Sequence, residues 1–474
     1  MKAAPQVEAK APRNLLFYEE NFMPGIAVKM KKTIFRKIKS DSDDLSALNL
    51  LKQVRSSFDD IEDRRTNRKS ITLSDALMSG LAMFSMKCPS LLQFDEKKKE
   101  KVIQHNLTTL YGIQTVPSDT QMRSILDEIE FRDLNSGFHA LHRSAVQAGV
   151  FDQYHFFQGR VLVSVDGTGY FSSSAIACPQ CCVKKHRNGK EEYYHQLLCA
   201  SVVHPDHKVV IPLMPEPIMK EDGDNKNDCE RNASKRLLKH LGEQYKHLKP
   251  IITEDSLSAN GPHIKLLKSL GFSYIIGVKE GDHTYLFDLI QKKMCQGETI
   301  EFEHVDEAGV IHGFRFINRV QLNESHPDLL VNFLEYWQIC EDKETIFAWV
   351  TDIELTKDTV SKVMEGGRAR WKIENETFNT LKNQGYNLEH NYGHGEKNLS
   401  SVFGCLMFMA FLIDQLQAWG CNLFKSARQS RRTLTSLWHR MHELFTSYLI
   451  PSWEVLWKAI ANGHRAGTLE IDTS

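Results

Sequence analysis

The chain has 474 residues, a formal net charge of −1, 41% hydrophobic residues and 25% charged residues. This length allows two to four domains with substantial cores. The composition is that of an ordinary soluble globular protein, which excludes a disordered or fibrous chain, and the near-neutral charge gives no overall sign of a nucleic-acid partner. The longest apolar run, residues 402–413, is too short to cross a bilayer, so we expect a buried helix there and no membrane association.

The first 40 residues form a basic segment that we expect to be loosely ordered. Six basic residues fall within eleven positions of this segment, with no acid among them: Lys29, Lys31, Lys32, Arg36, Lys37 and Lys39. A cluster of this kind is usually a solvated tail, but it also suits contact with phosphates. We take Lys31, Lys32, Arg36 and Lys37 as candidate DNA contacts.

Residues 41–155 have a helical pattern throughout. Apolar residues recur at helical spacing at its start (Leu45, Leu48, Leu51 and Val54). Thr72 with Asp75, and Ser118 with Gln121, have the spacing of capping boxes that begin helices. We expect a compact domain of five or six helices. A DNA-end-binding domain and a dimerisation or scaffold bundle both fit this pattern.

At residue 156 the pattern changes to that of a mixed sheet. We expect residues 156–279 to begin with a strand over 161–166 that ends at Asp166, followed by a Gly-Thr-Gly turn. The next elements are strands at 194–203 and 208–213, a helix at 228–248 and a short strand at 250–255 that ends at Asp255. A helix to residue 270 and a strand at 272–278 then complete a β-α-β unit with parallel pairing.

A β-rich insertion follows over residues 280–355, with strands expected at 299–305, 314–320 and 346–350. Residues 356–395 return to the core with a helix over 368–382 and a Gly-His-Gly loop. Residues 396–474 form a helical carboxy-terminal region that begins with an apolar helix at 397–418. This order of strands and helices is the ribonuclease H-like arrangement, an α/β fold with a mixed sheet flanked by helices.

Asp166 and Asp255 end strands that would lie side by side at the centre of this sheet. Ligand sites of open α/β sheets gather beyond the carboxyl ends of such strands. Carboxylate oxygens are hard ligands that suit Mg²⁺ or Mn²⁺. A pair of these ions can activate an attacking oxygen and stabilise a leaving one in phosphodiester displacement.

We expect the third carboxylate on the helix over 368–382. At about 100° per residue, Arg370, Trp371, Phe378 and Leu381 all lie close to Glu374 on one face. Glu374 therefore belongs to the stripe that faces the sheet, whereas Glu376 should face away. Arg370 and Lys382 flank Glu374 on the same face, where they can hold phosphates or balance charge.

Several motifs resemble those of the bacterial insertion-sequence transposases of the DDE type. They are Val163-Ser164-Val165-Asp166-Gly167-Thr168-Gly169, Asp228-Cys229-Glu230-Arg231-Asn232-Ala233, Thr253-Glu254-Asp255 and Arg370-Trp371-Lys372-Ile373-Glu374-Asn375, with weaker likeness in 75–95, 117–123 and 389–395. The resemblance covers most of the chain from residue 74 onward. Many relatives carry a tyrosine three residues before the arginine and a lysine seven after the glutamate; this chain has Gly367 and Leu381 there, with Lys382 next.

The resemblance implies that Asp166, Asp255 and Glu374 bind divalent metal and that the helical amino-terminal domain binds the inverted-repeat ends of an element. It also implies double-stranded DNA as partner, a homodimer in a synaptic complex, and a place in the bacterial cytosol at the nucleoid. We expect an enzyme that cleaves DNA at element ends and joins the freed 3′-hydroxyl to target DNA. The alternatives are a nicking endonuclease and a transposase-derived DNA-binding protein without strand transfer.

The densest group of soft ligands is Cys178, Cys181, Cys182 and His186, with His195 and Cys199 beyond. Thiols at two-residue spacing suit zinc, which makes a zinc site one hypothesis. The alternative is a hairpin with reduced thiols, as expected for a cytosolic protein without a secretion signal.

Three further interpretations depend on where a residue lies in its predicted strand, domain or loop. Glu254 should point to the opposite face of its strand from Asp255. Trp337 and Trp349 are more typical of a β-domain core than of a surface that stacks a base. His390 and His394 beside the glycine loop are expected to serve loop packing more than substrate contact.

Overall fold

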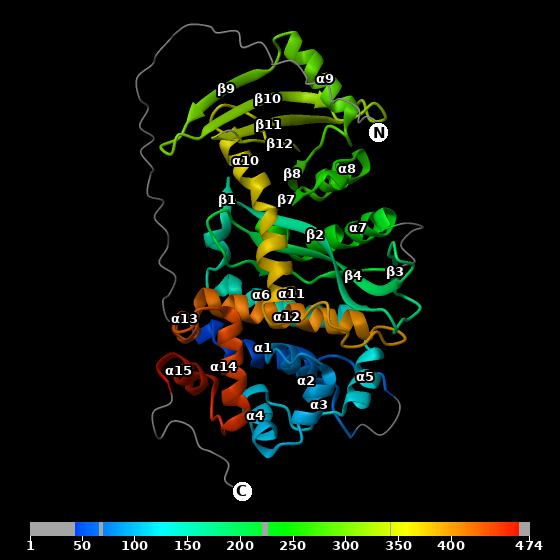
Figure 1. Ribbon diagram of the computed structural model, residues 1–474, viewed down its shortest axis with the longest axis vertical. Coiled ribbons are helices and arrows are strands. Elements are labelled where there is room, and N and C mark those ends of the chain that lie inside the picture. Colours follow the sequence, from blue (N-terminus) through cyan, green and yellow to red (C-terminus); the bar gives the residue numbers. More distant parts are fainter. Residues whose placement is uncertain (1–42, 66–69, 220–225, 342, 464–474) are drawn as a thin grey trace, which may run out of the picture. The chain divides into compact units, whose positions relative to one another are not determined.

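One mixed sheet runs through the protein in the strand order β3-β4-β2-β7-β8-β12-β11-β10-β9, with β1 on β2, and β5 and β6 on β4 (Figure 1). The computed structural model describes residues 43–65, 70–219, 226–341 and 343–463, which belong to one compact unit. The strands are β1 (His155–Phe157), β2 (Arg160–Ser173), β3 (Cys182–Lys185), β4 (Glu191–Val203), β5 (Ile211–Pro212), β6 (Glu216–Ile218), β7 (Ile251–Glu254), β8 (Ser273–Gly277), β9 (Ile300–Val305), β10 (Ile311–Gln321), β11 (Leu330–Cys340) and β12 (Lys343–Thr351).

The centre of the sheet has the pairing that the sequence predicts. β2 and β4 are antiparallel, whereas β7 lies parallel to both β2 and β8. The β7–β8 connection passes through α8 (Gly261–Leu270), which Asn260 caps at its start and Gly271 ends in a left-handed conformation. The third strand expected over 208–213 is shorter, because only β5 pairs with β4 there.

The turn expected after Asp166 is absent, because β2 continues through Gly167 and Gly169 to Ser173. β4 supplies partners along this whole length: Asp166 lies opposite Cys199 and Gly169 opposite Gln196. The ladder becomes irregular only beyond residue 170, where Phe171 has a φ of 50°. Asp166 therefore lies within a strand and not at the end of one.

The insertion region adds its strands to the same sheet. β9, β10, β11 and β12 form an antiparallel series, and β12 pairs with β8 through Trp349↔Gly277 and Thr351↔Ile275. Trp337 is 8% and Trp349 5% exposed, and the Trp337 indole N–H donates to Glu303 Oε1 at 2.8 Å. Both tryptophans are core residues, as the sequence favours.

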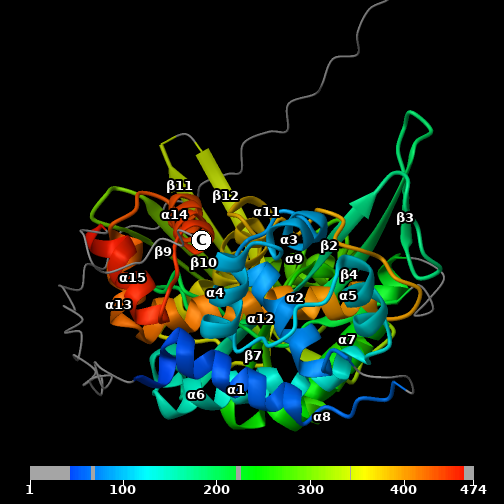
Figure 2. The ribbon, with the colours of Figure 1, turned by 90° about the horizontal axis from the view of Figure 1, so that it is seen from below.

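Helices cover the sheet and form a second layer beneath it. They are α1 (Ala47–Asp59), α2 (Leu73–Ser85), α3 (Leu91–Lys97), α4 (Lys101–Tyr111), α5 (Asp119–Asp127), α6 (Asn135–Gln147), α7 (Lys226–Gln244), α8, α9 (Thr284–Cys295), α10 (Val360–Ala369), α11 (Asn379–Asn383), α12 (Leu399–Gly420), α13 (Asn422–Gln429), α14 (Leu434–Ser447) and α15 (Trp453–Asn462). Figure 2 shows α1, α2 and α4 in front of α12, and the β3 hairpin projecting at one side.

α12 joins the two layers. It packs against β5 on one side and against α1, α2 and α5 on the other (Figure 1). Among the described helices it alone has the length and apolar composition to cross a membrane, yet 94% of its most apolar window is buried inside the protein. This burial agrees with the core helix that the sequence predicts.

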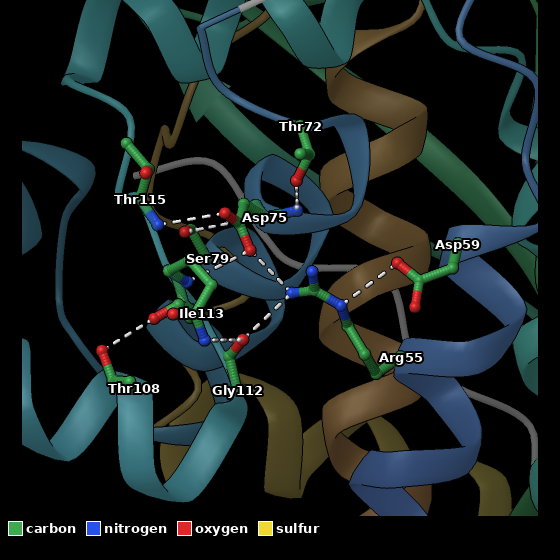
Figure 3. Close-up of polar contacts among 10 residues, drawn as sticks. Arg55, Asp59, Thr72, Asp75, Ser79, Thr108, Gly112, Ile113 and Thr115 are labelled. Atoms are coloured by element: carbon green, nitrogen blue, oxygen red, sulfur yellow. Dashed lines mark hydrogen bonds and ion pairs between the residues drawn. The ribbon is translucent and has the colours of Figure 1, made fainter.

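The amino-terminal helices begin where the capping signals predict. Ser118 and Gln121 form a reciprocal capping box at α5, and Thr72 accepts from the Asp75 N–H at α2. Asp75 is buried and accepts from Arg55 Nη1 at 2.7 Å and from the Thr115 N–H at 3.0 Å, which ties α1 and the loop after α4 to α2 (Figure 3). The expected stripe of α1 is wrong at Leu48, which is 41% exposed; the buried face consists of Ala47, Leu50, Leu51, Val54 and Phe58.

Candidate functional site

Asp166 and Asp255 line one small cleft at the centre of the sheet. Asp166 projects from β2 and accepts from the Gly167 N–H at 2.8 Å. Asp255 is exposed, follows β7 directly and accepts from the Leu257 N–H at 3.0 Å, so it caps the short helical turn over 256–258. The parallel pairing of β2 with β7 is what brings these two residues to the same cleft.

Glu374 reaches Asp166 through an arginine. Arg370 Nη1 lies 3.0 Å from Asp166 Oδ2 and 2.8 Å from Glu374 Oε1, so one guanidinium bridges two carboxylates from separate elements. The Glu374 side chain is 36% exposed, whereas those of Arg370 and Asp166 are 15% and 21% exposed. Of the two roles expected for Arg370, the structure shows the balancing of charge within the site.

The three predicted carboxylates share one electrostatic environment. Burial raises the pKa of Asp166 to about 7; the Arg370 charge and the Gly167 hydrogen bond oppose this rise, and the charges of Glu374 and Asp255 add to it. Asp166 is therefore only partly ionised near neutral pH unless further positive charge is present. The three carboxylates do not converge within 4.8 Å of one another: among the described residues, the sole His, Cys, Asp and Glu group that close lies elsewhere.

The segment that holds Glu374 is not a regular α-helix. Ile373–Phe378 is π-helical and lies between α10 and α11. A wheel at about 100° per residue therefore places some side chains wrongly: Trp371 is 49% exposed and does not face the sheet. The buried positions are Ile373, Thr377, Phe378, Thr380 and Leu381. Glu376 is half-buried and forms no ion pair with the residues that the structure describes.

Lys382 does not reach the carboxylates. Its Nζ lies 2.9 Å from Glu389 Oε1, and both residues line a surface pocket with Gly169 and Tyr170 of β2. A DNA contact by Lys382 remains a prediction. The candidate contacts Lys31, Lys32, Arg36 and Lys37 lie outside the described residues.

Two acids next to the cleft escaped the sequence reasoning. Glu254 is 4% exposed and accepts from His263 Nε2 of α8 at 2.5 Å, so it belongs to a buried pair that also lines the cleft. Glu230 of α7, which helix-start chemistry would explain, also lines it; a Cβ added at Gly167 would lie 3.5 Å from its carboxylate. The motif Asp228-Cys229-Glu230-Arg231-Asn232-Ala233 is the sequence signal that could have pointed to Glu230.

The cysteine group contains different residues from those predicted. Cys178 and Cys181 lie together, but their neighbours are His195 and His394. Cys182 Sγ lies 4.0 Å from Gln196 Oε1, and His186 pairs with Glu192 at 2.9 Å near the hairpin turn. The prediction that Cys182 and His186 belong to this group was wrong, because β3 begins at Cys182 and leads the chain away from the group. His394 is buried and lies 2.8 Å from the Phe171 carbonyl, as expected of a loop-packing residue, and it also belongs to this group.

Comparisons with known proteins do not assign the chain to a family. No family model and no curated protein match the chain. Among solved structures, a piggyBac transposase in a synaptic complex with hairpin DNA is similar with a TM-score of 0.37 and 9% identity, over 87% of this chain and 79% of that one. A superposition this loose assigns neither fold family nor function.

Proposed function

We propose that the chain is a DDE-type transposase with a ribonuclease H-like core, in which Asp166, Asp255 and Glu374 hold Mg²⁺ or Mn²⁺. The observation that carries this proposal is the charge environment of Asp166. Acids from the residue after β7 and from the π-helical segment both act on the carboxylate that β2 carries. Three elements far apart in sequence have no structural need to gather acids at a partly buried position.

The donor set fits a hard divalent cation. All three side chains offer carboxylate oxygens, which Mg²⁺ prefers. Burial raises the pKa of Asp166 to about 7, and Arg370 opposes this rise without cancelling it. When bound, the ions supply Lewis-acid activation of a phosphodiester and of the attacking oxygen.

The remaining residues orient this site and suit a DNA backbone. Arg370 fixes Glu374 next to Asp166, and the missing side chain at Gly167 leaves space in front of the Glu230 carboxylate. Beside the cleft, Arg231, Lys235 and Lys239 of α7 line a second pocket. A row of cations next to the carboxylates favours phosphate binding. We propose double-stranded DNA as the substrate, bound by a homodimer in the bacterial cytosol.

The decisive experiment uses the full chain and a supercoiled plasmid that carries the sequences flanking its gene. With Mg²⁺, we expect donor cleavage and joined products in a target plasmid, and neither product in EDTA. Nicked donor without joined products would instead make the chain an endonuclease. Binding without cleavage would make it a transposase-derived DNA-binding protein, an outcome that the three filled acidic positions oppose.

A further inference from the structure

The thiol and imidazole group lies apart from the carboxylates, beyond the bend of β2. Cys178 and Cys181 come from the loop between β2 and β3, His195 from β4 and His394 from the loop between α11 and α12. Their ligand atoms all lie within 4.8 Å of one another, and all but Cys178 are buried. The described structure brings together no other group of this kind.

The spacing of these atoms is that of a tetrahedral metal shell. Zinc bonds of about 2.3 Å to sulfur and about 2.0 Å to nitrogen place two sulfurs about 3.8 Å apart and sulfur about 3.5 Å from nitrogen. The observed Sγ–Sγ distance is 3.6 Å, and His195 Nε2 lies 3.5 Å from Cys178 Sγ and 3.6 Å from Cys181 Sγ. His394 Nδ1 is closer, 2.9 Å from Cys181 Sγ, and would have to move outward slightly.

Hydrogen bonds around the group hold the imidazoles in the orientation that metal binding needs. His394 Nε2 lies 2.8 Å from the Phe171 carbonyl, which can only accept, so the proton is on Nε2 and the Nδ1 lone pair faces the thiols. His195 Nδ1 lies 3.4 Å from Ser400 Oγ. The Cys178 N–H points to Cys181 Sγ at 3.3 Å. Outer partners of this kind fix the tautomer and ring orientation of metal-bound histidines.

Other roles for these side chains fit less well. A disulfide is absent, since all described cysteines are free. A nucleophilic cysteine would need access to substrate, but Cys181 is 3% and His195 6% exposed. Sulfur and imidazole ligands favour zinc over the hard cations that suit the carboxylate site.

We propose that Cys178, Cys181, His195 and His394 form a closed, structural zinc site. This site links the β2–β3 loop and β4 to the loop that follows the Glu374 segment. The same region is already joined by backbone hydrogen bonds, from the Phe171 N–H to the Leu388 carbonyl at 3.1 Å and from the Ser172 N–H to the Glu389 carbonyl at 3.3 Å. The site thus fixes the far end of the strand that holds Asp166, and it stands whether or not the chain is a transposase.

The test measures metal in the purified full chain, with Cys182→Ser as the matched control for Cys181→Ser. Cys182 is the next residue of the same loop and is half-buried, but it lies outside the group. We expect about one zinc per chain in the wild type and in Cys182→Ser, and a loss of most zinc in Cys181→Ser. Equal loss in both serine variants, or wild-type protein without zinc after growth in zinc-supplemented medium, would overturn the site.

A second measurement on wild-type protein covers the case in which Cys181→Ser does not fold. Protein produced with cobalt in place of zinc should show the visible absorption of tetrahedral Co²⁺ and thiolate-to-cobalt charge transfer. Octahedral cobalt absorption without charge transfer would exclude a Cys₂His₂ shell. Cobalt-loaded His186→Ala should keep the wild-type spectrum, since His186 is paired with Glu192 outside the group.

Discussion

Two polar groups lie near the strand β2, and they differ in the chemistry of their ligands and in how deeply these ligands are buried. The carboxylate site near Asp166 has oxygen ligands, an exposed Asp255 and an internal arginine. The thiol site beyond Phe171 has sulfur and nitrogen ligands, three of them buried, and hydrogen bonds that fix its histidines. Structural metal sites are closed, whereas catalytic ones keep positions open for substrate. Under the two proposals, β2 therefore carries one carboxylate of a site that reacts and leads at its far end into a site that holds the strand in place.

The largest effect should come from removing Glu374. Glu374→Gln deletes a charged ligand that Arg370 links to Asp166, so cleavage and joining should both fall more than about 100-fold, while DNA binding remains. Glu376→Gln, two residues away on the same segment, should keep most activity. Cleavage assays on element-end DNA with gel-shift controls measure both. An active Glu374→Gln beside an inactive Glu376→Gln would reject the assignment of the open site.

The next largest effect is on stability, and it distinguishes a structural site from a catalytic one. Cys181→Ser should lower the free energy of unfolding by more than about 4 kcal/mol, because a lost metal site is among the few causes of losses that large. Asp255→Asn should change it by less than about 0.5 kcal/mol, since Asp255 is exposed and asparagine can still cap the Leu257 N–H. Urea unfolding measures both. A destabilised Asp255→Asn would mean that the carboxylate site is structural too.

Removing the internal arginine should make the carboxylate site depend on added cations for stability. Arg370→Gln leaves Asp166 and Glu374 without their counter-charge, which should cost about 1–3 kcal/mol in EDTA. Mg²⁺ should restore more stability to this variant than to the wild type. Arg368→Gln is the control, because Arg368 is an exposed neighbour whose described contacts are with Gln338 and with the rings of Tyr336 and Phe347. Equal Mg²⁺ responses in the three proteins would argue against a cation site.

The smallest effect is a pH dependence at the edge of the cleft. Burial lowers the pKa of His263, but the charge and hydrogen bond of Glu254 outweigh burial and raise it. A raised folded-state pKa gives stability that is complete below about pH 6.5 and is lost as pH rises through the folded-state value. Wild type should therefore lose stability relative to His263→Gln across that window in urea unfolding. Parallel pH profiles of the two proteins would show that the pair does not titrate in this way.

Local sequence signals predicted the framework of the carboxylate site. A short apolar run before Asp255, a capped helix and a second apolar run are sufficient to predict the parallel pair β7–β8. The glycines after Asp166 gave no indication that β2 continues as a strand, since the extended backbone there depends on partners in β4. The pairing of β12 with β8 is likewise a long-range choice without a local signal.

The ligands of the thiol site could not all be predicted from local sequence patterns, because some of them lie far apart in the sequence. Cys178 and Cys181 are close in sequence, but His195 lies 17 residues from Cys178, and His394 lies 213 residues from Cys181. Cys182 and His186 are nearer along the chain and yet lie outside the group. Ligand spacing identifies a motif only where all ligands belong to one local unit.

The π-helical segment changes how residues are counted along the helix beyond Glu374. A π turn closes from residue i to i+5, so such a segment takes up about one residue without adding a turn. Lys382 follows Glu374 by eight positions, and the extra residue leaves about seven, close to two α-helical turns. Lys382 accordingly lies beside Gly169 and Tyr170 on the strand that holds Asp166. Two helical turns place Lys382 about 11 Å along the helix axis from Glu374, and its contact with DNA remains a prediction. A one-residue deletion within 375–377 should therefore turn the π-helical segment into a regular α-helix and keep that spacing, whereas a one-residue insertion should break it.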